Sequence, residues 1–259
     1  MTVAVSGVKG AGEMNHWCIK MSVMIILTGM LTGCLGNRDW EYPPGTPGQY
    51  LDLKASHSFP SRVLVLPFND LRGDEVQEGY WKAAIPLVPY GMTSYDRPEK
   101  IPSPEQVDEV HFDPSRDFAK ATASELQEAG IFSSVTFSET RDSSSPDLIL
   151  HGRIHSTKWE RAITTYLLGP LGPIFWILGL PMGETTTMLE MDLSLTYPDD
   201  PSNVIWGMTM EFKGNQWDGP YYGLEDAVQS YPEAIQEALK PAILNLTQLV
   251  VKQPDQFTP

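Results

Sequence analysis

The chain has 259 residues, of which 41% are hydrophobic and 20% are charged, and its formal net charge is −15. Such an acidic chain excludes nucleic acid as an expected partner, because nucleic-acid binding depends on Lys and Arg side chains that neutralise phosphates. It also offers no basic stripe for anionic lipid headgroups, so attachment to a membrane must come from lipid or apolar groups.

The N-terminal part of the chain has the features of a bacterial export signal. Lys20 is followed by an uncharged, mostly apolar stretch, 21–33. This stretch is shorter than the ~20 residues that a helix needs to cross a bilayer, and it has the length of the apolar region of a signal peptide. It runs into Leu31-Thr32-Gly33-Cys34, which resembles the lipobox of bacterial lipoproteins. We therefore predict a signal peptide over 1–33, cleaved before Cys34.

Cys34 is then the expected lipidated N-terminus of the mature protein. Acyl chains such as palmitate on its sulfur and amine would supply the multiple-chain anchor that stable membrane attachment requires. Translation is expected to start at Met14, because a signal needs nothing before it. The only other cysteine, Cys18, lies within the signal, so no internal disulfide is expected in the mature chain. An ordinary apolar N-terminus that happens to end in cysteine is the alternative.

The predicted location follows from the residue after the cysteine. Leu35 stands there in place of Asp, and by resemblance to the sorting rules of enteric bacteria this favours the outer membrane. The folded part would then face the periplasm.

A tether and a first strand are expected next. Residues 34–58 contain several prolines and glycines, so we expect a flexible tether behind the lipidated cysteine, with the folded domain over 59–253. Residues 62–68 form an apolar, β-branched run bounded by prolines, which predicts a buried strand. Residues 69–113 form a long, irregular, proline-rich stretch, and a loop of this length inside a domain usually has a function.

A helix is predicted from Asp113 to Gly130. Asp113 is a typical N-cap residue, Pro114 suits the first helical position, and Gly130 suits the C-terminal end. Residues 131–138 predict a strand. Residues 148–155 predict another, because apolar and polar side chains alternate along them.

The clearest predicted element is a β-hairpin over 189–212. Apolar and polar side chains alternate on both arms, which are joined by a turn at 198–203. Residues 224–251 have a helical pattern that Pro232 and Pro241 are expected to split into shorter helices. This order of elements predicts an α+β fold in a single domain: a mixed β-sheet with a long antiparallel hairpin, covered by helices.

The residues that commonly carry chemistry do not form a recognisable catalytic set. His151 and His155 lie about 13 Å apart on one face of a strand, so they cannot bind one metal ion together. Asp70, which follows the first strand closely, could lie at the strand edge where α/β enzymes place their sites. It has no Ser, Cys or His nucleophile arrangement beside it. We therefore predict no catalytic, cofactor-binding or metal-binding residues, and no enzymatic activity.

An uncharged segment, 166–182, interrupts the predicted domain. Its glycines and prolines exclude a regular transmembrane helix. Three interpretations stay open: a loop over the domain's own core, an interface with another protein or subunit, or contact with the bilayer. An exposed apolar patch typically marks one of the two contacts. The candidate interface residues are Leu168, Leu171, Ile174, Phe175, Trp176, Ile177 and Leu178.

The order of several segments carries a family resemblance. These segments are 62–68, the helix end at Gly130-Ile131-Phe132, the strand Pro146 to Ile154, and the hairpin arm around Val204-Ile205-Trp206. Over roughly residues 60–250 the chain resembles the periplasmic proteins related to the curli secretion protein CsgG, to PelC and to the N-terminal domain of TolB. The resemblance implies an α/β envelope protein without enzymatic activity. Several such proteins form rings that serve secretion or assembly, and in the curli channel some strands extend into the membrane.

These observations predict a membrane-anchored periplasmic lipoprotein that acts as a non-enzymatic accessory or assembly component of a cell-envelope complex. Its expected partners are the membrane, through the lipid, and either other proteins or further copies of itself. Two alternatives stay open. One is a subunit of a secretion pore, and the other is a periplasmic hydrolase or ligand-binding protein that uses the 69–113 loop.

Overall fold

The computed structural model describes the following residues: 40–45, 47–73, 77–83, 89–97, 112–141, 145–168, 171–223, 227–253, 255 and 257. The predicted signal peptide and Cys34 lie outside them, as do the first residues of the predicted tether.

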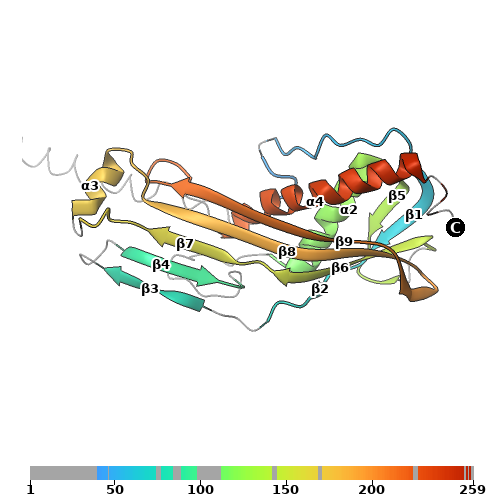
Figure 1. Ribbon diagram of the computed structural model, residues 1–259, viewed down its shortest axis with the longest axis horizontal. Helices are drawn as coiled ribbons and strands as arrows, with labels where there is room; N and C mark the ends of the chain where they lie inside the picture. Colours follow the sequence, from blue (N-terminus) through green and yellow to red (C-terminus); the bar gives the residue numbers. More distant parts are fainter. Residues whose placement is uncertain are drawn as a thin grey trace, which may run out of the picture. The chain divides into compact units, whose positions relative to one another are not determined.

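A long β-hairpin organises the sheet (Figure 1). Its arms, β8 (Gly183–Tyr197) and β9 (Asp200–Asp218), pair along nearly their whole length. The other edge of β8 pairs with two strands in succession, first β7 (Trp159–Ile163) and then β6 (Leu148–Ser156). Because both are antiparallel to β8, β6 and β7 follow one another along the same line. The hairpin therefore connects two halves of one sheet.

The half that contains β6 is covered by helices. Strand β1 (Phe59–Val65) pairs in parallel with β6 and with β5 (Phe132–Phe137). The short β2 (Asn69–Asp70) continues in parallel beside β6. Helices α2 (Pro114–Ala129) and α4 (Ala227–Lys252) accompany this half (Figure 1). The combination of parallel and antiparallel strands confirms the predicted α+β class with a mixed sheet.

The half that contains β7 is built differently. Two antiparallel strands, β3 (Gln77–Ala83) and β4 (Pro89–Tyr95), extend the sheet beyond β7. A single-turn helix, α3 (Gly172–Ile177), lies in the connection from β7 to β8. Strands β2, β3 and β4 all fall within the stretch 69–113, which we expected to be irregular. That expectation was wrong because β2 pairs with β6, β4 with β7 and β3 with β4, and this pairing orders segments that lack a clear apolar alternation of their own.

The core lies between the hairpin and α4. Leu189, Met191 and Leu195 on β8 are buried on the face that carries Met210 of β9, as the alternation predicted. Helix α4 buries an apolar stripe that includes Ile235, Leu239, Ile243, Leu246 and Val250. This packing also explains a wrong expectation. Helix α4 is continuous through Pro232 and Pro241, because burial of its face offsets the backbone hydrogen bonds that proline removes.

Helix α2 begins and ends as predicted. The Asp113 side chain accepts a hydrogen bond from the Ser115 backbone N–H at 3.1 Å, and proline follows in the first turn. At the other end Gly130 has a φ of 66°, the left-handed conformation that glycine adopts without strain.

The predicted tether is partly wrong, because its second part packs against α2. The Leu51 backbone N–H donates to the Glu125 carboxylate at 3.1 Å, and the Ala55 N–H donates to the Ala129 carbonyl at 2.8 Å. The Tyr42 hydroxyl also donates to Glu125, at 2.5 Å. Burial and the Glu125 carboxylate raise the pKa of Tyr42, so its hydroxyl stays protonated as a donor. Prolines and glycines signalled turns here, but the apolar side chains between them join the core.

Replacement of Leu193, which is 2% exposed on the α4-covered face of β8, tests this arrangement. We expect Leu193→Ala to lower the free energy of unfolding by about 2–5 kcal/mol, because it leaves a cavity under the helix. Urea titration measures the change. Ser194→Ala, on the opposite face of the same strand, should change the stability by less than about 0.5 kcal/mol. Equal losses in the two variants would contradict the assigned faces.

Candidate functional site

The connection between β7 and β8 exposes a group of aliphatic side chains, which we call the apolar tip. Their exposed fractions run from 42% to 102%. The apolar tip consists of Leu167, Leu168, Leu171, Ile174, Ile177, Leu178 and Leu180. Since aliphatic side chains are normally withdrawn from water, their collection in one connection makes it the candidate contact surface.

Other side chains hold the apolar tip in place. Trp176 is 7% exposed, and its indole Nε1–H donates to the Thr164 carbonyl at 3.0 Å. The Tyr166 hydroxyl donates to the Pro181 carbonyl at 2.5 Å, and the Tyr166 and Phe175 rings lie 5.7 Å apart. These contacts tie the start of the connection to its end through side chains other than the exposed aliphatic ones.

The candidate interface residues divide accordingly. Leu168, Leu171, Ile174, Ile177 and Leu178 are all exposed and available for contact. Phe175 is half-buried against Tyr166. Trp176 is buried, so its assignment as an interface residue was wrong. Successive residues of a helix point about 100° apart, and α3 turns Trp176 toward Thr164 while Ile177 points into solvent.

Backbone strain accompanies the exposed leucine at the start of the tip. Tyr166 and Leu167 have φ angles of 57° and 63°, the left-handed region that costs about 1–2 kcal/mol per non-glycine residue. Leu167 is then fully exposed. Strain of this kind concentrates at functional sites.

Two tyrosines that the sequence analysis missed complete this surface. Tyr221 and Tyr222 are exposed in the turn after β9. Their hydroxyls lie 3.4 Å from the carbonyl oxygens of Ile177 and Gly179, respectively. The signal that could have identified them is a pair of adjacent tyrosines between glycines and a proline, where a turn of small or polar residues is usual.

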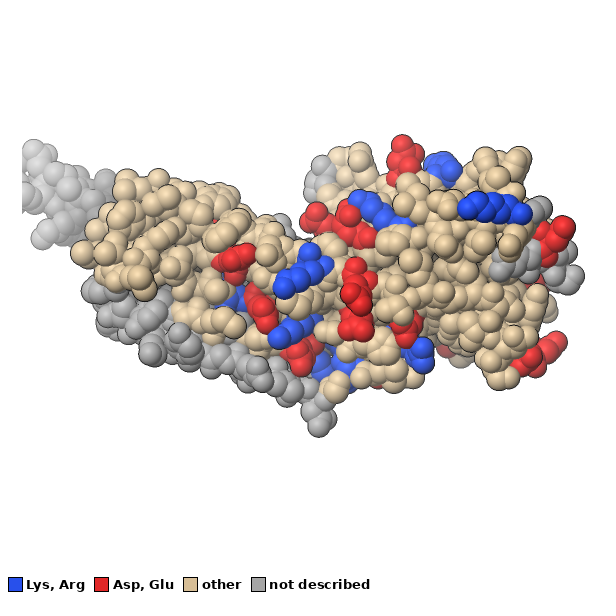
Figure 2. Space-filling view, in the orientation of Figure 1, with Lys and Arg blue, Asp and Glu red and all other residues tan. Residues whose placement is uncertain are grey.

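The charged residues lie elsewhere. From residue 162 to residue 183 the sequence contains no Asp, Glu, Lys or Arg. Figure 2 shows the same contrast on one face: blue and red side chains gather over the middle of the sheet, and the end that carries α3 is tan. The apolar tip is therefore separate from the acidic surface of the rest of the molecule.

A buried ion pair lies at the base of the apolar tip, on the inner face of the hairpin. Asp218 is 1% exposed, its Oδ2 lies 3.5 Å from Arg161 Nε, and Thr185 donates to the same oxygen at 3.3 Å. Its Oδ1 has no hydrogen-bond partner. The face of the hairpin that is apolar under α4 thus becomes polar toward the apolar tip.

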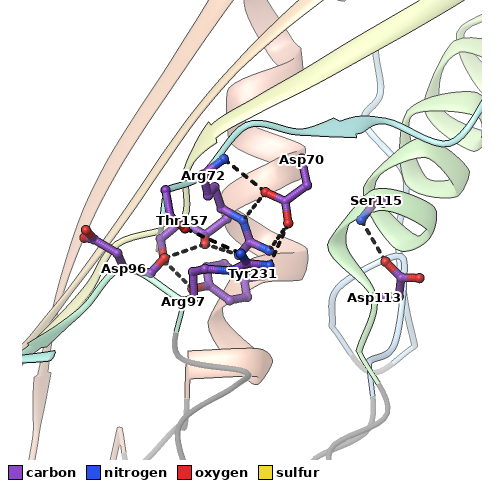
Figure 3. Close-up of polar contacts among 9 residues, drawn as sticks. Asp70, Arg72, Asp96, Arg97, Asp113, Ser115, Thr157 and Tyr231 are labelled. Atoms are coloured by element: carbon purple, nitrogen blue, oxygen red, sulfur yellow. Dashed lines mark hydrogen bonds and ion pairs between the residues drawn. The ribbon is translucent and has the colours of Figure 1, made fainter. Parts of the chain in front are cut away.

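A second cluster, which we call the polar junction, lies where β6 gives way to β7. It consists of Asp70, Arg72, Arg97, Thr157 and Tyr231 (Figure 3). Arg72 holds both carboxylate oxygens of Asp70 at 2.9 Å, and Arg97 donates to Asp70 Oδ2, also at 2.9 Å. The other terminal nitrogen of the buried Arg72 guanidinium, Nη1, donates to the Thr157 hydroxyl at 2.6 Å.

Asp70 is therefore a structural anion. Its hydrogen bonds from Arg72, together with the charges of Arg72 and Arg97, hold the pKa of Asp70 below its ordinary value, against the opposing effect of partial burial. A carboxylate held in this way is a poor general base. The fully buried Tyr231 of α4 donates to the Thr157 carbonyl at 2.6 Å, so the junction joins α4, β2 and the end of β4 to the gap between β6 and β7.

The two histidines lie on the outer face of β6, on the same side of the strand as expected. His151 Nε2 lies 3.2 Å from the Thr196 hydroxyl, and burial, with the charge of Arg141, lowers the pKa of His151. His155 Nε2 lies 2.8 Å from Asp192. Burial raises the pKa of Asp192, but hydrogen bonds from Thr209 and His155 outweigh it, so the net shift is downward. Within the described ranges, no group of three or more His, Cys, Asp or Glu side chains could hold a metal ion.

In the part of the chain that the structure describes, no helix is both long enough and apolar enough to span a membrane.

Comparison with known proteins finds distant similarity only. No protein family matches the sequence, and no curated protein matches it. Among solved structures, protein XCC0632 from Xanthomonas campestris, assigned to the family DUF330, has a TM-score of 0.40 at 11% identity, covering 80% of this chain and 96% of that chain. An uncharacterised protein has a TM-score of 0.33 at 7% identity, with coverages of 82% and 98%.

A third structure is a homolog of a neuraminyllactose-binding hemagglutinin from Helicobacter pylori. It has a TM-score of 0.35 at 11% identity and covers 81% of this chain and 96% of that chain. None of these three descriptions names CsgG, PelC or TolB, and similarity at this level identifies no function.

Removal of the Tyr231 hydroxyl tests the polar junction. We expect Tyr231→Phe to lower the free energy of unfolding by about 1–3 kcal/mol, because it leaves the buried Thr157 carbonyl without this donor. Urea titration measures the loss. Tyr221→Phe, which removes an exposed hydroxyl, should cost less than about 0.5 kcal/mol. If the two variants lose equal stability, the Tyr231 hydroxyl does not support the junction.

The pH dependence of stability tests the Asp70 ion pairs. Because the folded-state pKa of Asp70 is lowered, its contribution is full above about pH 4 and is lost as the pH falls through the folded-state pKa. We therefore expect Asp70→Asn to be less stable than the wild type by about 2 kcal/mol at pH 7, and this difference to shrink in acid. Thermal unfolding from pH 7 to pH 2.5 measures it. Asp199→Asn, at a fully exposed carboxylate, should match the wild type throughout. A difference that is constant with pH would contradict the assigned ion pairs.

Proposed function

We propose that this chain is a lipid-anchored protein of the bacterial outer membrane, facing the periplasm, where it serves as a non-enzymatic accessory or assembly component of an envelope complex. The observation that carries the proposal is Leu31-Thr32-Gly33-Cys34 behind a short apolar stretch. Acyl chains on Cys34 would keep the folded part at the membrane surface without a spanning segment.

The folded part supports a role in contact more than in catalysis. The ionisable side chains that sequence reasoning singled out are engaged in structural pairs, Asp70 with Arg72 and Arg97, and His155 with Asp192. The apolar tip, in contrast, leaves seven aliphatic side chains exposed. Proteins that act by assembly expose such surfaces, whereas enzymes present convergent polar groups in a pocket.

The resemblance to the curli secretion group suggests a finer version of this proposal, in which several copies assemble as a ring. A role as a secretion pore subunit is the rival version. The burial of the hairpin's apolar face by α4 supports the peripheral role, because a hairpin inserted in a membrane would need that face for lipid.

The other rival is a hydrolase or ligand-binding protein that uses the 69–113 loop. Asp70 is the residue of this stretch that the sequence pointed to, and two arginines already neutralise it. This pairing favours the non-enzymatic role.

Substitution of the predicted acylated cysteine tests the anchor. Cys34→Ala should abolish metabolic labelling with radioactive palmitate and leave an uncleaved precursor, because the sulfur that receives the lipid is lost. Cys18→Ala, within the predicted signal, should be labelled and cleaved normally. Mass spectrometry of the purified native protein should find an acylated Cys34 at the N-terminus. An unmodified mature N-terminus at another residue would overturn the proposal.

A further inference from the structure

We propose that the apolar tip inserts into the headgroup region and outer acyl region of a lipid bilayer, the same bilayer that holds the acyl chains of Cys34. The inference rests on the proposed function in one respect, since the lipid anchor supplies the nearby membrane. The tip would then be a second point of attachment that sets how the folded domain stands on the membrane.

The chemistry of the surface fits lipid. The apolar tip is entirely aliphatic, and the run 162–183 has no charge to desolvate. Tyr221 and Tyr222 lie beside it, and tyrosine rings with a polar tip favour the level of the headgroups. Protein interfaces take most of their binding energy from Trp, Tyr and Arg, with Leu under-represented. Tyr221 and Tyr222 suit either kind of contact, but the seven exposed aliphatic side chains of the apolar tip suit a bilayer better than a protein partner or a second copy.

Several backbone carbonyls of the connection between β7 and β8 accept hydrogen bonds from side chains, as carbonyls must where water is scarce. Aromatic side chains donate to several of its carbonyls: Trp176 to Thr164, Tyr166 to Pro181, and Tyr221 and Tyr222 more weakly to Ile177 and Gly179. In water an exposed carbonyl needs no such donor, because solvent supplies it. Away from water every carbonyl must find a partner within the protein.

The backbone strain at Tyr166 and Leu167 also supports insertion into a bilayer. The Tyr166 backbone N–H donates to the Thr164 hydroxyl, and its side-chain hydroxyl donates to the Pro181 carbonyl. Leu167 adopts the same left-handed conformation but directs its side chain into solvent. Glycine or asparagine would adopt this conformation with less strain. A leucine there is explained if its side chain has an apolar medium to enter.

The length of the chain between the anchor and the fold permits both contacts. From Cys34 to Trp40 an extended chain spans at most about 20 Å. Trp40 packs on Phe118, which in turn contacts Tyr231 at the polar junction. From there β7 leads to the tip over roughly 20 Å at its strand rise. A bilayer that holds Cys34 could therefore also meet the tip if the direction from Trp40 to the tip lies close to the membrane surface.

Fluorescence quenching in vesicles tests the proposal on the full-length acylated protein. Leu178, which is 73% exposed, is changed to Cys and labelled with an environment-sensitive fluorophore. The acylated Cys34 leaves this thiol as the only reactive one in the mature chain. The matched control is Val204→Cys, a 55% exposed site at the other end of β9. Ile174→Cys gives a second position on the tip, and unchanged unfolding temperatures show that the variants are folded.

The labelled proteins are reconstituted into phosphatidylcholine vesicles that contain a lipid with a nitroxide on its acyl chain. We expect this lipid to quench the label at Leu178 several-fold more than the label at Val204, and aqueous iodide to do the reverse. If iodide quenches both labels equally, the tip lies in water and the proposal is wrong. If neither quencher reaches the tip, a protein or a second copy covers it, and the proposal is also wrong.

The two proposals fail in distinguishable ways. An unacylated Cys34, seen by mass spectrometry, would overturn the proposed function and leave the tip to be tested alone. In that case the same label at Leu178 in a Cys34→Ser chain is mixed with an excess of vesicles. Quenching by the nitroxide lipid would support insertion of the tip, and its absence would overturn it.

Discussion

The structure depends on the double pairing of one strand. Along one edge β8 pairs with β9, and along the other it pairs with β7 and then with β6. Strand β6 pairs on its other edge with β1 and β2, whereas β7 pairs with β4. Strand β8 therefore belongs to two different halves of the sheet. Its inner face changes accordingly, from Leu195 and Leu193 under α4 to Thr187, which bonds Ser230 near the start of α4, and then to Thr185, which bonds Asp218. The backbone hydrogen bonds of β8 thus join two halves of the sheet. The half that contains β6 packs on the hydrophobic core, and the half that contains β7 leads to the apolar tip.

The polar junction follows from that arrangement, because a gap in a line of strands leaves backbone groups to be satisfied. Tyr231 and Arg72 bond the backbone carbonyl and the hydroxyl of Thr157 in the gap, and Asp70 neutralises the buried guanidinium. The topology therefore accounts for the charged groups of the polar junction. This is a reason to look for function at the apolar tip, which the topology does not explain.

Sequence reasoning predicted the elements whose patterns are local. Alternation identified the hairpin and β6, and caps identified α2, because each signal lies within a few residues of the structure it specifies. It did not predict that β6 and β7 lie in line, that β3 and β4 are strands, or that Leu51 docks on Glu125, since those depend on partners far away in the chain. For 166–182 the uncharged run fitted both core and contact surface. Which of these residues is buried depends on how α3 is rotated about its axis: Trp176 faces inward and Ile177 faces solvent.

The physical consequences of a lipid anchor and an apolar tip are linked. A freely diffusing protein with such a tip risks self-association, which its strong negative charge opposes by mutual repulsion. Tethered at Cys34, the tip would meet the bilayer at a high effective concentration, since the short chain to Trp40 confines it near the surface. Insertion of a few aliphatic side chains, too weak to hold the protein by itself, would then suffice to orient it. If both contacts form, the protein would present one fixed side away from the membrane, an orientation that would favour assembly with a partner.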